Sequence, residues 1–80
     1  MTVKTVTIYG PGHPTEEAKT VGRAYITQLV AQGATDGIIH AESPGDGTLH
    51  ITRFWTTIND ATTWAAYIAD WNPISVEVIE

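Results

Sequence analysis

Four segments of the chain alternate between apolar and polar residues or concentrate β-branched side chains, as β-strands do. This pattern predicts strands over residues 3–9, 36–42, 48–55 and 74–79. Residues 10–14 hold two glycines and two prolines, and residues 43–47 read Ser-Pro-Gly-Asp-Gly. Both runs are turn signals, and the second is typical of a hairpin loop. The second and third strands are therefore expected to pair as a hairpin.

Two longer segments place apolar residues every three or four positions, which is the period of an α-helix. The first helix is expected from residue 14 or 15 to residue 32, where Gly33 follows as a stop signal. The second is expected over residues 58–71. Thr57 followed three positions later by Asp60 resembles the capping box that opens a helix.

Each predicted helix carries one apolar stripe that we expect to face the sheet. The stripe of the first helix consists of Ala18, Val21, Gly22, Tyr25, Ile26 and Leu29, and that of the second of Ile58, Ala61, Trp64, Ala65, Ile68, Ala69 and Trp71. Gly22 lies inside its stripe, where the missing side chain is expected to let the helix approach the sheet closely. That use would offset its lower helix propensity of about 1 kcal/mol.

The elements follow one another as strand, helix, strand, strand, helix, strand within 80 residues, a length that holds one domain. Right-handed crossovers then leave few compact arrangements. The order predicts an α+β fold of the ferredoxin-like β-α-β-β-α-β kind, with a four-stranded antiparallel sheet and both helices on one face. Residues 1–80 are expected to form this single domain.

The hairpin has two registers that keep the apolar side chains of its strands on one face. One pairs His40 with His50, and the other pairs His50 with Glu42. Both place the two histidines on the helix-free face of the sheet. That face is expected to carry Thr5, Thr7, Tyr9, Ile38, His40, His50, Thr52, Phe54, Ser75, Glu77 and Ile79.

The helix-free face is too apolar to be left in water and too polar for an internal core, so a second copy of the chain is expected to cover it. A small domain buries a modest share of its surface and commonly needs additional support. The chain has no cysteine, which excludes disulfides and thiolate metal sites. We therefore predict a homodimer or higher oligomer formed through this face.

The chain is acidic, with nine Asp and Glu residues against four Lys and Arg residues and a net charge of −5. A negative protein is repelled by phosphate backbones and by anionic membranes, so neither nucleic acid nor a membrane is an expected partner. No apolar run reaches the roughly 18 residues of a membrane span. The first residues lack the pattern of a secretory signal, which favours a cytoplasmic location.

Two histidines and a group of aromatic residues are the candidates for chemistry. His40 and His50 have the side chains for proton transfer or metal binding. Without a third ligand they favour polar interface packing, and no metal site is predicted. Tyr25, Trp55 and Trp64 are expected either to surround a small, flat organic ligand or to pack in the core. The glycines of residues 10–12 lack the spacing of a nucleotide-binding loop, so no cofactor is predicted.

Residues 53–61, Arg-Phe-Trp-Thr-Thr-Ile-Asn-Asp-Ala, resemble the dimeric α/β-barrel families, which include antibiotic-biosynthesis-type monooxygenases. In those families a strand ending in an aromatic residue and Trp leads into a helix opened by Ser or Thr and then an acidic-Ala pair. The resemblance implies a ferredoxin-like domain that dimerises by packing two sheets face to face. The families include oxygenases, isomerases, decolourising peroxidases and members of no known activity, so the resemblance concerns fold and assembly more than chemistry.

Two functions stay open at this point. One is a non-enzymatic homo-oligomeric module that is structural or binds a small ligand. The other is a cofactor-independent enzyme of the monooxygenase or isomerase kind, with an imidazole as acid or base. The short chain and the missing motifs favour the module. A pocket bounded by Tyr25, Trp55 and Trp64 that also contains a buried histidine would favour the enzyme.

Overall fold

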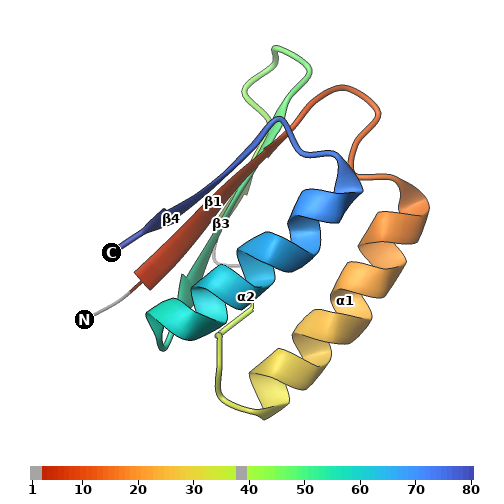
Figure 1. Cartoon of the computed structure of the whole chain (residues 1–80). Coiled ribbons are helices and arrows are strands. Elements are labelled where there is room, and N and C mark those ends of the chain that lie inside the picture. The colour runs from red at the N-terminus through yellow and green to blue at the C-terminus, as the bar shows by residue number, and fades with distance from the viewer. Residues whose placement is uncertain (1–2, 38–39) are drawn as a thin grey trace.

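The computed structural model describes residues 3–37 and 40–80 (Figure 1). The elements are β1 (Val3–Tyr9), α1 (Glu16–Ala31), β2 (His40–Glu42), β3 (Leu49–Trp55), α2 (Ile58–Ile68), the short 3-10 helix η1 (Ala69–Trp71) and β4 (Ser75–Ile79). The strands form one antiparallel sheet in the order β2-β3-β1-β4. Both helices lie side by side on the same face of the sheet (Figure 1). The predicted ferredoxin-like α+β fold is confirmed.

Both long helices begin with a side-chain hydrogen bond from the N-cap residue, and the one at Thr57 is the bond that the sequence predicts. Thr57 Oγ1 accepts from the backbone N–H of Asp60 at 3.1 Å and donates to the Asp60 carboxylate at 2.9 Å. Thr15 Oγ1 accepts from the backbone N–H of Ala18 at 3.2 Å, so α1 begins directly after Thr15. These bonds satisfy first-turn N–H groups that have no partner within the helix. Gly33, with φ of +75°, follows the end of α1 as predicted.

The second strand is shorter than predicted, because residues 36 and 37 lie outside it. Thr35 holds this segment to the end of β3 instead. Its hydroxyl donates to the carbonyl of Phe54 at 2.7 Å and accepts from the backbone N–H of Gly37 at 3.2 Å. The prediction for Ile38 lies outside the described residues.

The hairpin takes the second of the two predicted registers. Glu42 lies opposite His50, and His40 lies opposite Thr52. The alternative that pairs His40 with His50 is therefore wrong. Ser43 Oγ closes the loop at this register by donating to the carbonyl of Thr48 at 3.1 Å.

β1 presents the opposite face to the helices from the one predicted. Thr5, Thr7 and Tyr9 lie beneath the helices and are 1, 3 and 6% exposed. Their neighbours Val6 and Ile8 lie on the helix-free face, across from Thr52 and His50. The prediction that Thr5, Thr7 and Tyr9 belong to the helix-free face is wrong.

A hydrogen bond between strands explains how a polar side chain is accepted beneath the helices. The indole Nε1 of Trp55 donates to Thr5 Oγ1 at 2.9 Å, and both groups are buried. A buried hydroxyl that has a partner avoids most of the penalty for leaving water. Because both faces of β1 carry β-branched residues, alternation alone does not reveal which face is buried.

The hydrophobic core lies between the sheet and α2. It consists of Val3, Trp55, Ala61, Trp64 and Ile68. The predicted stripe of α2 is confirmed at its three central buried residues, whereas Ile58 at its start is 43% exposed. Within the described chain, no helix is long and apolar enough to cross a membrane.

α1 packs on the sheet much less closely than predicted. Only Ala18 of its stripe is buried, and Val21 is 39% exposed. A Cβ atom added at Gly22 would have no other atom within 4 Å. The expectation that Gly22 brings helix and sheet into close contact is therefore wrong, and space remains between them.

Candidate functional site

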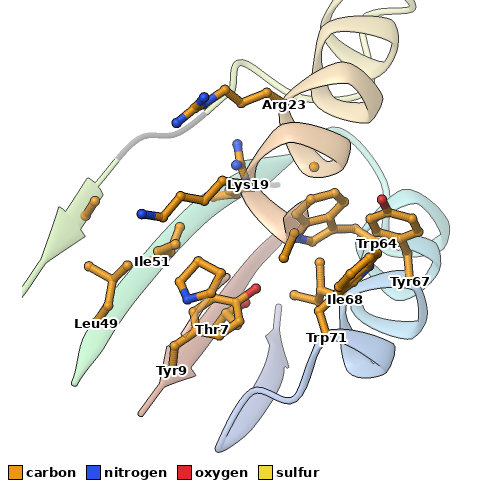
Figure 2. A pocket seen from close by; sticks show the side chains of 15 residues that line it. Thr7, Tyr9, Lys19, Arg23, Leu49, Ile51, Trp64, Tyr67, Ile68 and Trp71 are labelled. Carbon is orange, nitrogen blue, oxygen red and sulfur yellow. The ribbon is translucent and has the colours of Figure 1, made fainter. Parts of the chain in front are cut away.

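The space between α1 and the sheet is a cavity of about 230 Å³ (Figure 2). Leu49 and Ile51 of β3 lie on one side of it, and Trp64 and Tyr67 of α2 lie on the other, with Trp71 of η1 beside them (Figure 2). A dry cavity of about 150 Å³ is enough to bind benzene. This cavity therefore has room for an aromatic ring system with a substituent.

Small residues on α1 leave this cavity open. Ala18 and Gly22 are one helical turn apart and both line it. Ala41 of β2, a third small residue, also lines it. The positions of α1 that point toward this space are thus occupied by alanine and glycine, whose side chains are too small to fill it. The sequence predicts Ala18 and Gly22 on one stripe, but it does not predict that the stripe stands away from the sheet.

Trp64 is the centre of an aromatic cluster that contains the three predicted pocket residues. Its ring centroid lies 6.0 Å from that of Tyr25, edge to face, and 5.8 Å from that of Trp55. Trp64 itself lines the cavity, whereas Tyr25 and Trp55 support it from outside the lining. The structure thus brings the three residues together but gives only Trp64 direct access to the cavity.

Tyr67 belongs to the same cluster, although the periodicity of α2 places it outside the apolar stripe. Its ring stacks on Trp64 with centroids 5.5 Å apart and lies 4.5 Å from the ring of Tyr25 on α1. Tyr67 follows Trp64 by three positions, so the two side chains lie on adjacent parts of the helix surface. The apolar stripe identifies residues that face the sheet, so it does not identify a residue such as Tyr67 that faces the neighbouring helix.

Arg53 brings a positive charge into this apolar setting. It is 7% exposed and lines the cavity from β3. Its Nε and Nη1 atoms are buried and have no hydrogen-bond partner within residues 3–37 and 40–80. Its guanidinium carbon lies 5.1 Å from the centre of the Trp64 ring, which is a cation–π contact.

Burial lowers the pKa of the Arg53 guanidinium to about 10, and nearby Tyr9 opposes this shift. Arg53 therefore remains charged at neutral pH. Burial also raises the pKa of the Tyr9 phenol; the positive charge of Arg53 opposes that shift, and Tyr67 adds to it. Tyr9 is thus a neutral hydroxyl at neutral pH. The pair is a buried cation beside a neutral phenol, not a buried ion pair.

The charges of the cavity are all of one sign. Lys19, Arg23 and Arg53 line it, which are three of the four basic residues in the chain. None of the lining residues within the described chain is acidic. Lys19 forms a salt bridge with exposed Glu16 at 3.2 Å, and Arg23 is exposed. An acidic protein thus carries a positive cavity.

The sequence indicates that Arg53 is buried, although arginine is a residue type that is usually exposed. Arg53 lies two positions from Ile51 and two from Trp55, so period-two alternation already assigns it to the helix-covered face. A charged residue at such a position is unusual, because buried arginine normally has a partner. The alternation of β3 thus predicts a buried cation, and the structure shows that it lines the cavity.

His13 and His50 do not line the cavity. His50 is on the helix-free face, with its Nε2 atom 3.0 Å from Thr48 Oγ1. His13 occupies the turn after β1, where its backbone N–H donates to the carbonyl of Gly10 at 3.1 Å. The backbone of His40 belongs to β2, and its side chain lies outside the described part of the structure.

No described histidine lines the cavity, so the combination of pocket and buried imidazole that would favour an enzyme is not found among residues 3–37 and 41–80. No group of three histidine, aspartate or glutamate residues that could hold a metal ion occurs among the described residues.

A scan against protein-family models, a search of curated proteins and a search of solved structures each find no match. The cavity and the residues that line it therefore carry the functional assignment. Its three properties are aromatic walls, a buried guanidinium with no ionic partner in the described part of the chain, and a positive rim.

Proposed function

We propose that this protein is a non-enzymatic binding module that holds a small, flat organic molecule in the cavity between α1 and the sheet. The observation that carries the proposal is the aromatic wall formed by Trp64, Tyr67 and Trp71 beside a cavity of about 230 Å³. Aromatic side chains offer large, rigid surfaces for a planar ligand. Leu49 and Ile51 provide an apolar surface on the opposite side.

Binding of 2-naphthamide, a flat and uncharged probe, tests this proposal by isothermal titration calorimetry. The variant Gly22→Leu places a large side chain at a cavity-lining position, so it should abolish the binding seen with the wild type. Ala24→Leu adds the same side chain at an exposed position of α1 and should bind as the wild type does. Equal binding by both variants would contradict the proposed site.

We also propose that the chain belongs to the dimeric α/β-barrel superfamily and forms a homodimer through its helix-free face. The resemblance of residues 53–61 to those families supports this proposal. So does the corrected orientation of β1, because Val6 and Ile8 join Phe54 and Ile79 on that face. On β1 the face thus carries Lys4, Val6 and Ile8 instead of two threonines and a tyrosine, which adds two large aliphatic side chains and one positive charge.

Light scattering at micromolar concentration tests the dimer, since it should give at least twice the chain mass of 8.7 kDa. Phe54→Glu places a charge on the helix-free face and should yield monomers. Thr63→Glu, on the exposed side of α2, should leave the mass unchanged. A wild-type protein that is monomeric at this concentration would rule out the dimer and leave the ligand proposal standing.

A further inference from the structure

We propose that the ligand is an aromatic carboxylic acid whose carboxylate binds the buried guanidinium of Arg53 while its ring lies against Trp64. The proposal names the ligand class of the cavity and rests on the proposed binding function. It begins from one unusual feature of the molecule. Arg53 is 7% exposed, and no carboxylate among residues 3–37 and 40–80 forms a salt bridge with it.

A charge that leaves water without a partner destabilises the folded protein, so buried arginines are almost always paired. No carboxylate within the described chain bonds to Arg53, and its Nε and Nη1 atoms have no hydrogen-bond partner there. The contact with the face of Trp64 compensates in part, because a ring face attracts cations. The hydrogen bonds still missing are those that an anion would accept.

Two phenols, those of Tyr9 and Tyr67, line the cavity together with Arg53. The hydroxyl of Tyr67 is buried and has no partner among the described residues. Tyr9 is neutral at neutral pH, because burial raises the pKa of its phenol. Hydroxyls and guanidinium groups both donate hydrogen bonds. A ligand that fits this site therefore brings acceptors, and a carboxylate has two acceptor oxygens.

Charge and shape favour a carboxylate over a phosphate ester. The interior offers one buried cation, which balances the single charge of a carboxylate, whereas a phosphate monoester carries close to two charges at neutral pH. The planar guanidinium fork matches a planar carboxylate. The surrounding walls, including Leu49, Ile51 and Trp71, are apolar and fit the hydrocarbon part of the same ligand.

The rim of the cavity favours entry of an anion. Lys19 and Arg23 extend from α1 over the side of the cavity where Leu49 and Ile51 lie (Figure 2). Both are less buried than Arg53. Positive charges lining a concave surface raise the local concentration of anions, even on a protein of net negative charge. Lys19 and Arg23 thus attract the acid, and Arg53 fixes its position.

Isothermal titration calorimetry with 2-naphthoate, 2-naphthamide and 2-naphthyl phosphate tests the ligand class. The naphthoate should bind at least about tenfold more tightly than the amide, because hydrogen bonds between ions are the stronger ones. Equal affinities would overturn the carboxylate assignment and leave the binding function intact. Tighter binding of the phosphate would also overturn it. No binding of any of the three would overturn both proposals.

Arg53→Met should remove the preference for naphthoate while the affinity for naphthamide stays within about threefold. Lys4→Met is the matched control, because it removes a positive charge from β1 outside the cavity lining, and it should keep the preference. If Arg53→Met retains the preference, the anchor is a different residue and the proposal fails.

A measurement on the wild-type protein tests the contact between ligand and Arg53 even if Arg53→Met does not fold. The chain has two arginines, so its NMR spectrum has two Nε–Hε signals, and Arg23→Met assigns them. Naphthoate should shift the Arg53 signal clearly more than naphthamide does. An Arg53 signal that responds equally to both probes would contradict the proposed contact.

Discussion

The two helices cover the same sheet, yet they use it differently. α2 buries Ala61, Trp64 and Ile68 against the strands, whereas α1 buries only Ala18. The cavity lies beside the loosely packed helix and opens where its small residues face the sheet. We infer that the two helices have different roles. α2 supplies buried packing against the sheet, and α1 covers the ligand site.

This difference between the two helices has an energetic consequence. Side chains between α2 and the sheet should contribute strongly to the free energy of unfolding, whereas side chains between α1 and the sheet should contribute little. Binding sites are commonly places where a protein gives up stability for function. Substitutions on the two sides should therefore differ in size and even in sign.

The largest effect is expected for Ile68→Ala in α2. Ile68 is 3% exposed, so its truncation leaves a cavity in the core and should lower the free energy of unfolding by about 2–5 kcal/mol. Val21→Ala in the predicted stripe of α1 should change it by about 0.5 kcal/mol or less, because Val21 is 39% exposed and alanine has the higher helix propensity. Urea denaturation measures both values. Similar midpoints for the two variants would contradict the different roles inferred for α1 and α2.

Arg53→Met should raise the free energy of unfolding of the ligand-free protein by about 1–3 kcal/mol. The substitution replaces a buried charge that has no ionic partner among the described residues with an apolar side chain of similar length, which removes the cost of burying the charge. The lost cation–π contact with Trp64 limits the gain. Arg23→Met, at an exposed position, should have an effect below about 0.5 kcal/mol. A destabilised Arg53→Met protein would mean that Arg53 serves the fold instead of a ligand.

Gly22→Ala should raise the free energy of unfolding by about 1 kcal/mol. Alanine has the higher helix propensity, and the added Cβ meets no atom within 4 Å. Gly33→Ala makes the same chemical change where φ is +75°, a conformation that costs an L-residue about 1–2 kcal/mol, so it should be destabilising. Opposite shifts in thermal midpoint are expected. A destabilising Gly22→Ala would show that α1 packs closely on its neighbours at this position.

The smallest effect expected is the contribution of Tyr9 to the stability of the folded protein at alkaline pH. Because burial raises the pKa of its phenol, the folded state favours the protonated form. The resulting stability is present below pH 10 and is lost as the pH rises through the raised pKa. Ultraviolet titration of the wild type minus that of Tyr9→Phe should have a midpoint above 10. A midpoint at or below 10 would show that Arg53 stabilises the phenolate more than burial disfavours it.

The sequence predicts the arrangement of elements well, because that arrangement rests on local signals. The Thr57 cap, the Gly33 stop and the hairpin loop each act within a few residues. The buried face of β1 was predicted wrongly for the opposite reason. It depends on a hydrogen bond between Thr5 and Trp55, which are 50 positions apart.

The candidate site was predictable only in part. Trp64 follows from the apolar stripe of α2, and the position of Arg53 follows from the alternation of β3. The cavity does not follow from either pattern, because it depends on how far α1 stands from the sheet. Tyr67 was missed since its partner is Tyr25 on the other helix, a contact between elements that periodicity within one helix does not show.

A crystal structure of the wild-type protein with 2-naphthoate would show which residue binds the carboxylate. We predict the naphthalene ring in the cavity against Trp64, with a carboxylate oxygen about 2.7–2.9 Å from a guanidinium nitrogen of Arg53, the usual length of a charge-assisted hydrogen bond. A naphthoate bound with its carboxylate on Lys19 or Arg23 at the rim, and Arg53 still unpaired, would contradict the account.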